Sequence, residues 1–196
     1  MAIKNVCVFC GARDGNVPAF RTLATALGAD LARRGMGLVY GGAAQGLMGA
    51  LADAVLAGGG HVRGVIPHGL ARKEFPHPRV KDLHFVDSMH ARKALMEQSA
   101  DAFIAMPGGF GTLDELFEIV TWSQVGLHRK PIGLLNADGY FDGLLAWRAR
   151  AVSDGFIGAA TAEALVVRDS PVALLDALVV HQPPPPVVQW IQRVKP

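Results

Sequence analysis

Ala102-Phe103-Ile104-Ala105-Met106 runs directly into Pro107-Gly108-Gly109-Phe110-Gly111-Thr112, and a helical pattern follows as far as Val125. Five apolar residues bounded by a proline and glycines predict a buried strand. The spacing of apolar residues over 112–125 predicts a helix. A strand, a glycine turn and a helix in this order form the building unit of a parallel α/β sheet.

The same alternation extends toward both ends of the chain. Further strands are predicted at Asn5–Cys10, Gly37–Tyr40, His61–Ile66, Asp82–Val86, Pro131–Leu135 and Ala164–Val167. Further helices are predicted at Val17–Arg34, Gly46–Leu56, Ser88–Ala100, Tyr140–Val152 and Ser170–Val180, with Ser88 as an N-cap. We therefore predict an α/β fold: a Rossmann-like open parallel sheet with helices on both faces.

Two segments lie outside this alternation. Residues 68–81 are polar, basic and interrupted by prolines, so we expect a loop or short irregular helix that acts as a mobile lid over a ligand. Pro183–Pro186 cannot continue the preceding helix. The predicted organisation is a single nucleotide-binding domain over residues 1–182, followed by a proline-rich tail over residues 183–196.

Composition restricts the class of protein. The chain has 196 residues, of which 51% are apolar and 18% charged, which favours a well-filled core over disorder. A net charge of +2 forms no basic stripe, so nucleic acid is not an expected partner. The N-terminus lacks the apolar segment of a secretory signal, and no apolar run has the length of a membrane span. We expect a cytoplasmic protein.

The two cysteines, Cys7 and Cys10, have C-x-x-C spacing. They lie inside a predicted strand, where side chains three positions apart point to opposite faces. No second Cys or Cys/His pair is placed to complete a zinc site. We therefore expect two buried thiols, no metal and no cofactor, in a reducing compartment.

Three predicted strands end in glycine-bearing turns, at Gly11, at Gly41-Gly42 and at Pro107–Gly111. Ligands of open parallel sheets bind outside the carboxyl ends of the strands. Glycines let the backbone approach an anion, and the helix that follows presents unpaired N–H groups. These turns predict a phosphate site, although neither a G-x-G-x-x-G fingerprint nor a G-x-x-x-x-G-K-[ST] loop is present.

Four segments in the same order resemble the Lonely Guy family of cytokinin riboside 5′-monophosphate phosphoribohydrolases, long mislabelled as lysine decarboxylases. Residues 107–115 match its P-G-G-x-G-T-x-x-E signature, and residues 88–93 are similar to its M-H-x-R-K segment. Residues 40–49 resemble its G-G-x-x-x-G-L-M-G segment, and Phe9-Cys10-Gly11 its opening strand and turn. Ala12 departs from the serine that usually follows, so one hydroxyl that could touch the ligand is missing.

The resemblance implies hydrolysis of the N-glycosidic bond of a nucleoside 5′-monophosphate, such as AMP or its N6-prenylated relative. It implies catalytic roles for Arg92, which would orient substrate, and for Glu115, which would stabilise a sugar cation or activate water. The substrate-binding residues it implies are Gly11, Gly41, Gly42, Met89, Arg92, Lys93, Pro107, Gly108, Gly109, Gly111, Thr112 and Glu115. The apolar helices at 113–125 and 140–152 further predict a homodimer.

Several alternatives stay open at this point. Thr112-Leu113-Asp114-Glu115 is also the sequence of a capping box, in which Glu115 would reach back to the Thr112 amide. Arg92 and Lys93 would fit a solvated helix face, and Met89 would fit a core position. A protein that binds a nucleotide or a molybdenum cofactor without turnover is the second candidate function. A decarboxylase would need pyridoxal phosphate on a lysine, and nothing marks Lys93 for that role.

Overall fold

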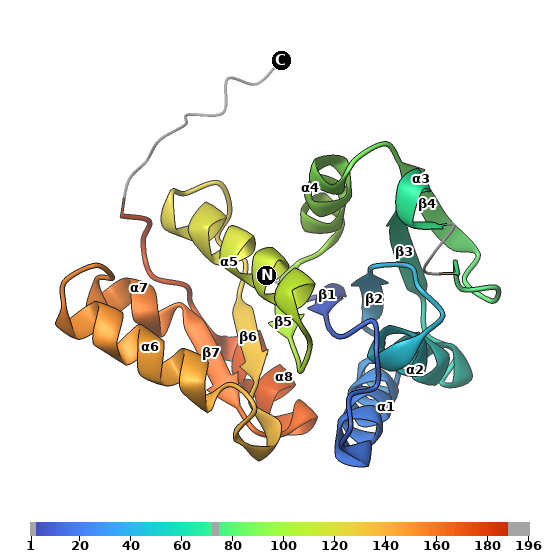
Figure 1. Ribbon diagram of the computed structural model, residues 1–196, viewed down its shortest axis with the longest axis horizontal. Coiled ribbons are helices and arrows are strands. Elements are labelled where there is room, and N and C mark those ends of the chain that lie inside the picture. The colour runs from blue at the N-terminus through green and yellow to red at the C-terminus, as the bar shows by residue number, and fades with distance from the viewer. Residues whose placement is uncertain (1–2, 72–74, 188–196) are drawn as a thin grey trace.

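The computed structural model describes residues 3–71 and 75–187 (Figure 1). Within these residues, seven parallel strands form one sheet in the order β4-β3-β2-β1-β5-β6-β7. The strands are β1 (Asn5–Phe9), β2 (Gly37–Tyr40), β3 (Val62–Pro67), β4 (Asp82–Val86), β5 (Ala102–Ala105), β6 (Ile132–Leu135) and β7 (Leu165–Arg168). The predicted α/β class and the parallel sheet are confirmed.

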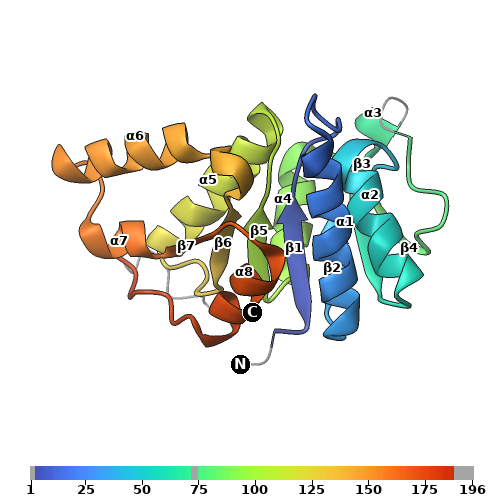
Figure 2. The ribbon, with the colours of Figure 1, turned by 90° about the horizontal axis from the view of Figure 1, so that it is seen from below.

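Helices cover both faces of the sheet (Figures 1 and 2). One face carries α1 (Pro18–Arg33), α2 (Gly46–Ala57) and α8 (Pro171–Val180), and the other carries α4 (Met89–Ser99) and α5 (Phe110–Gln124). Side chains along β1 alternate between the two faces of the sheet. Val6 and Val8 pack in the core under the first group of helices, and Cys7 and Phe9 pack in the core under the second. The remaining helices are α3 (His68–Ala71), α6 (Asp142–Ser153) and α7 (Ala159–Glu163), with a 3₁₀ turn η1 at Ala137–Gly139.

Two helices begin at other residues than predicted, and one short helix is additional. Helix α5 begins at Phe110, two residues before the predicted start at Thr112, with Gly109 as its N-cap. Helix α6 begins at Asp142 rather than Tyr140, because the 3₁₀ turn precedes it. Helix α7 was not predicted. Ser88 caps α4 as expected, since its hydroxyl accepts a hydrogen bond from the Ala91 amide at 3.1 Å.

The segment that follows β3 is tied to the turn after β2. The Ala44 amide donates to the Phe75 carbonyl and the His77 amide donates to the Gly42 carbonyl, both at 3.0 Å. The buried His77 ring lies 3.1 Å from Asp53 of α2. None of the described residues of 68–81 lines the cavity described below. The described part of this segment therefore packs against one of the three glycine turns without lining the cavity, and the lid stays a prediction, because residues 72–74 lie outside the described residues.

The start of the proline-rich tail follows the C-terminal end of α5. Arg129 donates a hydrogen bond to the Pro183 carbonyl at 3.2 Å, and the Val187 amide donates to the Gln124 carbonyl at 3.0 Å. The division into a domain over 1–182 and a tail over 183–196 stays a prediction, since 188–196 lie outside the described residues. Among the described helices, none is long and apolar enough to cross a membrane.

Candidate active site

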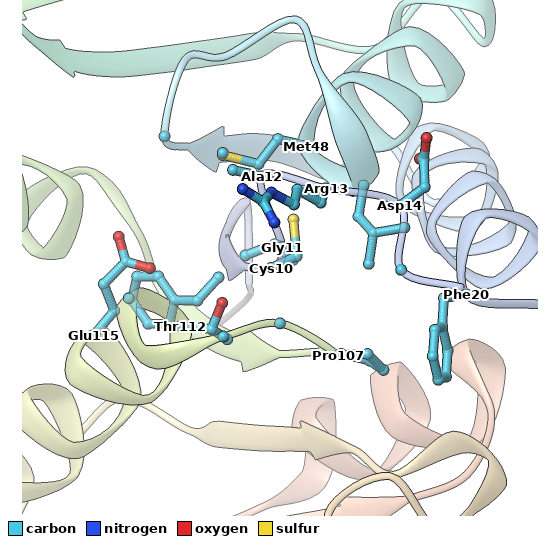
Figure 3. Close-up of a pocket in the computed structure, with 18 of the residues that line it drawn as sticks. Cys10, Gly11, Ala12, Arg13, Asp14, Phe20, Met48, Pro107, Thr112 and Glu115 are labelled. Atoms are coloured by element: carbon cyan, nitrogen blue, oxygen red, sulfur yellow. The ribbon is translucent and has the colours of Figure 1, made fainter. Parts of the chain in front are cut away.

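The order of the strands brings two glycine turns together. From β1 the chain builds outward to β4 on one side, and then β5 pairs with the other side of β1. The topological switch point therefore lies between β1 and β5, where ligands of open α/β sheets bind. The turns after these strands touch, because the Gly11 amide donates to the Pro107 carbonyl at 3.0 Å. A cavity of about 480 Å³ opens at this edge (Figure 3).

The structure brings most of the predicted site residues into this one cavity. Its lining includes Gly11, Gly41, Met89, Arg92, Pro107, Gly108, Gly109, Gly111, Thr112 and Glu115. Gly42 and Lys93 do not line it. Lining residues that were not predicted include Arg13, Asp14, Phe20, Met48 and Tyr140. Of the basic residues between 63 and 93 that are described, Arg92 alone lines the cavity.

The turn between β5 and α5 is shaped to leave backbone groups accessible. A Cβ on Gly108 would collide with the Thr112 hydroxyl and would lie 2.9 Å from the Gly11 nitrogen. A Cβ on Gly109 or Gly111 would meet nothing within 4 Å, so these glycines leave their side of the turn open. Gly109, the N-cap of α5, has no side chain to satisfy the first-turn amides. Such a helix start is suited to bind an anion.

Thr112 does not cap the helix that carries Glu115. With Gly109 as N-cap, Thr112 is the third residue of α5, and its buried side chain lines the cavity. A capping box requires the threonine at the N-cap position. The structure therefore excludes the capping box that Thr112-x-x-Glu115 suggested.

Arg92 is a buried guanidinium that the main chain holds in place. Its Nε donates to the Val65 carbonyl at 3.2 Å and its Nη2 to the Gly41 carbonyl at 3.3 Å. A Cβ on residue 41 would displace the guanidinium from this position, so glycine there leaves room for it. Only 6% of Arg92 is exposed, so it does not belong to a solvated helix face. The carbonyls fix where the positive charge lies within the cavity wall.

Glu115 lies opposite this guanidinium. Its Oε1 is 3.9 Å from Arg92 Nη2, and 8% of the residue is exposed. Figure 3 shows Glu115 and Thr112 extending from α5 on one side of the cavity, with Met48 on the other. A buried carboxylate is costly unless a cation accompanies it, and Arg92 provides that cation. The arrangement places a negative oxygen where a positive charge on a ligand could be stabilised.

Lys93 connects α4 to α5 outside the cavity. Its Nζ lies 3.1 Å from Asp114 Oδ2 and 3.0 Å from Glu118 Oε2. Burial lowers the pKa of Lys93, but the hydrogen bonds and charges of Glu118 and Asp114 outweigh that effect and leave the pKa above its ordinary value. This is the opposite of the lowered pKa that a Schiff-base lysine needs. The ion pairs instead tie together the two helices that carry Arg92 and Glu115.

Cys7 and Cys10 are free and buried, as predicted. Cys7 packs in one core and Cys10 in the other, so the C-x-x-C spacing does not bring the two thiols to one face. Burial raises the pKa of both thiols, and the nearby Glu115 charge adds to the effect. Cys10 also lines the cavity, as an uncharged thiol.

Two aromatic residues at the cavity were missed by sequence reasoning. Tyr140, just after η1, donates its hydroxyl to the Gly108 carbonyl at 2.6 Å. Its ring meets Phe20 of α1 edge to face, with 5.4 Å between the centroids. The hydrogen bond spans 32 residues of sequence, and no local signal announces it. It braces the glycine turn from the neighbouring β6–α6 connection.

The fold and this cavity define a Rossmann-like α/β protein with a small-molecule site at its switch point. The model of a family described as "Possible lysine decarboxylase" matches residues 48–178. The chain belongs to this family, which is the Lonely Guy family that its four motifs resemble.

Curated relatives give the family's named activity. The chain is 53% identical to the probable cytokinin riboside 5′-monophosphate phosphoribohydrolase LOGL9 of Oryza sativa subsp. japonica, over 79% of this chain and 68% of the relative. It is 51% identical to the cytokinin riboside 5′-monophosphate phosphoribohydrolase LOG7 of Arabidopsis thaliana, over 79% and 71%. It is 46% identical to LOGL5 of Oryza sativa subsp. japonica, a probable enzyme of the same name, over 93% of this chain and 74% of the relative.

Solved structures of lower identity share the fold. The molybdenum cofactor binding protein of Rippkaea orientalis superposes with a TM-score of 0.68 at 22% identity, covering 92% of this chain and 99% of that one. The Moco carrier protein of Chlamydomonas reinhardtii superposes with a TM-score of 0.67 at 19% sequence identity, and the match covers 89% of this chain and 94% of that one. At these identities the similarity extends to the fold alone.

Proposed function

We propose that this protein is a phosphoribohydrolase that cleaves the N-glycosidic bond of nucleoside 5′-monophosphates. Water adds to the anomeric carbon, the carbon–nitrogen bond breaks, and the products are the free base and ribose 5-phosphate. The observation that carries the proposal is the buried Arg92–Glu115 pair, 3.9 Å apart, facing an open glycine turn across one cavity. Family membership supports the same activity, since the named relatives are phosphoribohydrolases.

The 5′-phosphate is proposed to bind at the N-terminus of α5. Gly109 and Gly111 leave the turn open, and Gly108 packs it against Gly11. The first-turn amides and the helix dipole favour an anion, and Thr112 adds a hydroxyl. This assignment predicts that nucleosides without phosphate turn over poorly. Equal rates for adenosine and AMP would contradict it.

Glu115 is proposed to act on the sugar. Cleavage of the glycosidic bond develops positive charge on the ribose ring, and a fixed carboxylate nearby stabilises that charge. The same carboxylate can accept a proton from the attacking water. Arg92, fixed by the Gly41 and Val65 carbonyls, holds a positive charge opposite Glu115 and orients the substrate. Lys93 and Gly42, which lie outside the cavity, are assigned supporting positions rather than ligand contacts.

The decisive experiment is chromatography of purified protein incubated with a panel of nucleoside monophosphates, including AMP and N6-prenylated AMP. Release of free base with equimolar ribose 5-phosphate is the expected result, and it also identifies the preferred base. Each substrate incubated under the same conditions without the protein is the blank. If the protein bound nucleoside monophosphates of the panel but released no free base, the result would contradict the proposed hydrolase activity and favour a carrier.

We also propose a homodimer. The exposed apolar side chains Phe117 and Trp147 pack against each other on α5 and α6, with ring centroids 5.7 Å apart. An apolar cavity of about 170 Å³ lies beside them, lined by Leu116, Val120, Leu144 and Leu145 among others. Apolar surface of this kind usually marks an interface. Light scattering at micromolar concentration tests the proposal, and a monomer would contradict it.

A cytoplasmic location is proposed on the basis of the two free, buried cysteines, which suit a reducing compartment. Fractionation of cells that express a tagged chain would test it. Recovery with secreted or membrane fractions would contradict it.

A further inference from the structure

Arg13 brings a second guanidinium to the cavity. It lies in the loop between β1 and α1 and lines the cavity together with Gly11 and Ala12. Figure 3 shows its side chain directed into the cavity, between Met48 and Cys10. Within the described residues, neither a hydrogen bond nor an ion pair engages this guanidinium. Its charge is therefore available to a ligand.

The other charges at the cavity already have partners. Arg92 donates to two main-chain carbonyls and lies 3.9 Å from Glu115. Asp14 is paired with Arg21 at 2.7 Å. Among the described lining residues, Arg13 is thus the cation that remains to balance an anionic ligand. A nucleoside 5′-monophosphate carries its negative charge on the phosphate, and guanidinium groups bind phosphate through forked, charge-assisted hydrogen bonds.

The loop that carries Arg13 is fixed beside the proposed phosphate turn. The Gly11 amide donates to the Pro107 carbonyl at 3.0 Å, and the Leu47 amide donates to the Gly11 carbonyl at 3.1 Å. A Cβ on Gly11 would lie 3.5 Å from the Gly108 Cα, so the two turns are in contact. Ala12 offers no hydroxyl from this loop. A side-chain donor from this side of the cavity can therefore come from the next residue.

We propose that Arg13 is a phosphate-binding residue that sets the preference for nucleoside monophosphates over nucleosides. It contacts the phosphate from the β1 side, while the amides at the start of α5 contact it from the β5 side. The inference rests on the proposed function, because it assigns the phosphate of that substrate. It adds a specificity-determining residue that the glycine signature alone does not contain.

Arg13→Ala and Arg13→Lys test the proposal, with Arg150→Ala as the matched control. Arg150 lies on α6, its side chain is 77% exposed, and it is not part of the cavity. For Arg13→Ala, the KM for AMP should rise roughly 10- to 100-fold, the range for a lost hydrogen bond to a charged group. The kcat should change little, and slow turnover of adenosine should be unaffected. For Arg13→Lys, the KM for AMP should lie between those of the wild type and Arg13→Ala, because lysine keeps the positive charge but cannot form the forked hydrogen bonds of a guanidinium.

Calorimetry with ribose 5-phosphate and with adenine separates this proposal from the proposed function. Arg13→Ala should weaken ribose 5-phosphate binding and leave adenine binding unchanged, whether or not the wild-type protein releases base. A wild-type protein that binds both but releases no base contradicts the proposed activity alone. An unchanged affinity for ribose 5-phosphate, or equal losses of AMP and adenosine turnover, would overturn the role of Arg13.

Discussion

The role of Glu115 depends on where its helix begins. A start at Thr112 would make the residue half of a capping box, whereas the observed start at Phe110 places Thr112 inside the first turn. The carboxylate lies in the cavity wall beside Arg92 instead. A difference of two residues in a helix boundary thus separates a structural role from a chemical one.

Glu115→Gln should fold normally and lose turnover. The amide keeps the shape of the side chain but removes the charge that would stabilise the sugar cation or accept a proton from water. We expect kcat for AMP to fall roughly 100-fold or more, the usual contribution of a positioned acid or base. AMP binding through the glycine turn should persist, as calorimetry can measure.

Glu118→Gln is the matched control for this change. Glu118 lies one turn further along α5 and pairs with Lys93, outside the cavity. The control should keep most of the wild-type kcat, so that loss of a negative charge on α5 alone does not explain the effect. Turnover near the wild-type level in well-folded Glu115→Gln would show that Glu115 is not the catalytic carboxylate.

Sequence patterns identify site residues that belong to local turns, and miss those that tertiary structure supplies. Gly108, Gly109 and Gly111 could be predicted because a glycine turn between a strand and a helix is a local signal. Arg13 and Tyr140 carry no such signal. Arg13 lies beside the glycine turn because β1 pairs with β5, and Tyr140 reaches it because β6 pairs with β5. Neither sequence spacing nor composition determines these neighbours.

At the scale of elements, the strands were predictable and short helices were not. All seven strands follow from apolar runs bounded by turn residues. Helix α7 has five residues, Ala159–Glu163, and follows two glycines, Gly155 and Gly158. A single helical turn forms too little of a repeating pattern to be recognised, and packing rather than propensity maintains it.

The connection from β6 to α6 should influence the phosphate turn through one hydrogen bond. Tyr140→Phe removes the hydroxyl that donates to the Gly108 carbonyl but keeps the ring against Phe20. The turn should then sample more conformations, and the KM for AMP should rise about 2- to 10-fold, as expected for one neutral hydrogen bond. Steady-state kinetics measures this.

The thermal midpoint of Tyr140→Phe provides the control, and it should stay within a few degrees of the wild type. Tyr140→Leu, which also removes the edge-to-face contact, should raise the KM further. An unchanged KM in Tyr140→Phe would show that the Gly108 turn keeps its geometry without this brace.

At the scale of the whole molecule, a buried histidine should make stability depend on pH. His128 lies against Phe103 in the core, donates from Nε2 to the Ile119 carbonyl and accepts at Nδ1 from the Lys130 amide. Burial lowers the pKa of His128 from its ordinary value of 6.5. Below about pH 6.5 the unfolded chain therefore binds a proton that the folded protein excludes.

The free energy of unfolding should fall as the pH decreases from about 6.5 toward the folded-state pKa of His128, by up to about 1.4 kcal/mol per pH unit from this group. His128→Gln should remove that part of the slope. His90→Gln, at an exposed position on α4, should leave it intact. Urea unfolding between pH 5 and pH 8 measures the three slopes. Identical slopes for wild type and His128→Gln would contradict the assignment.

The proposed dimer makes the sharpest prediction for the whole molecule. Trp147 is 53% exposed and packs edge to face on Phe117, beside an apolar cavity between α5 and α6. Trp147→Glu places a charge where a second copy would bury apolar surface, and an unpaired buried charge strongly disfavours association. Light scattering should then give half the wild-type mass at micromolar concentration. Val180→Glu makes the same kind of change at an exposed apolar residue of α8, on the other face of the sheet, and should remain dimeric. A dimeric Trp147→Glu protein with wild-type circular dichroism would move the interface away from α5 and α6.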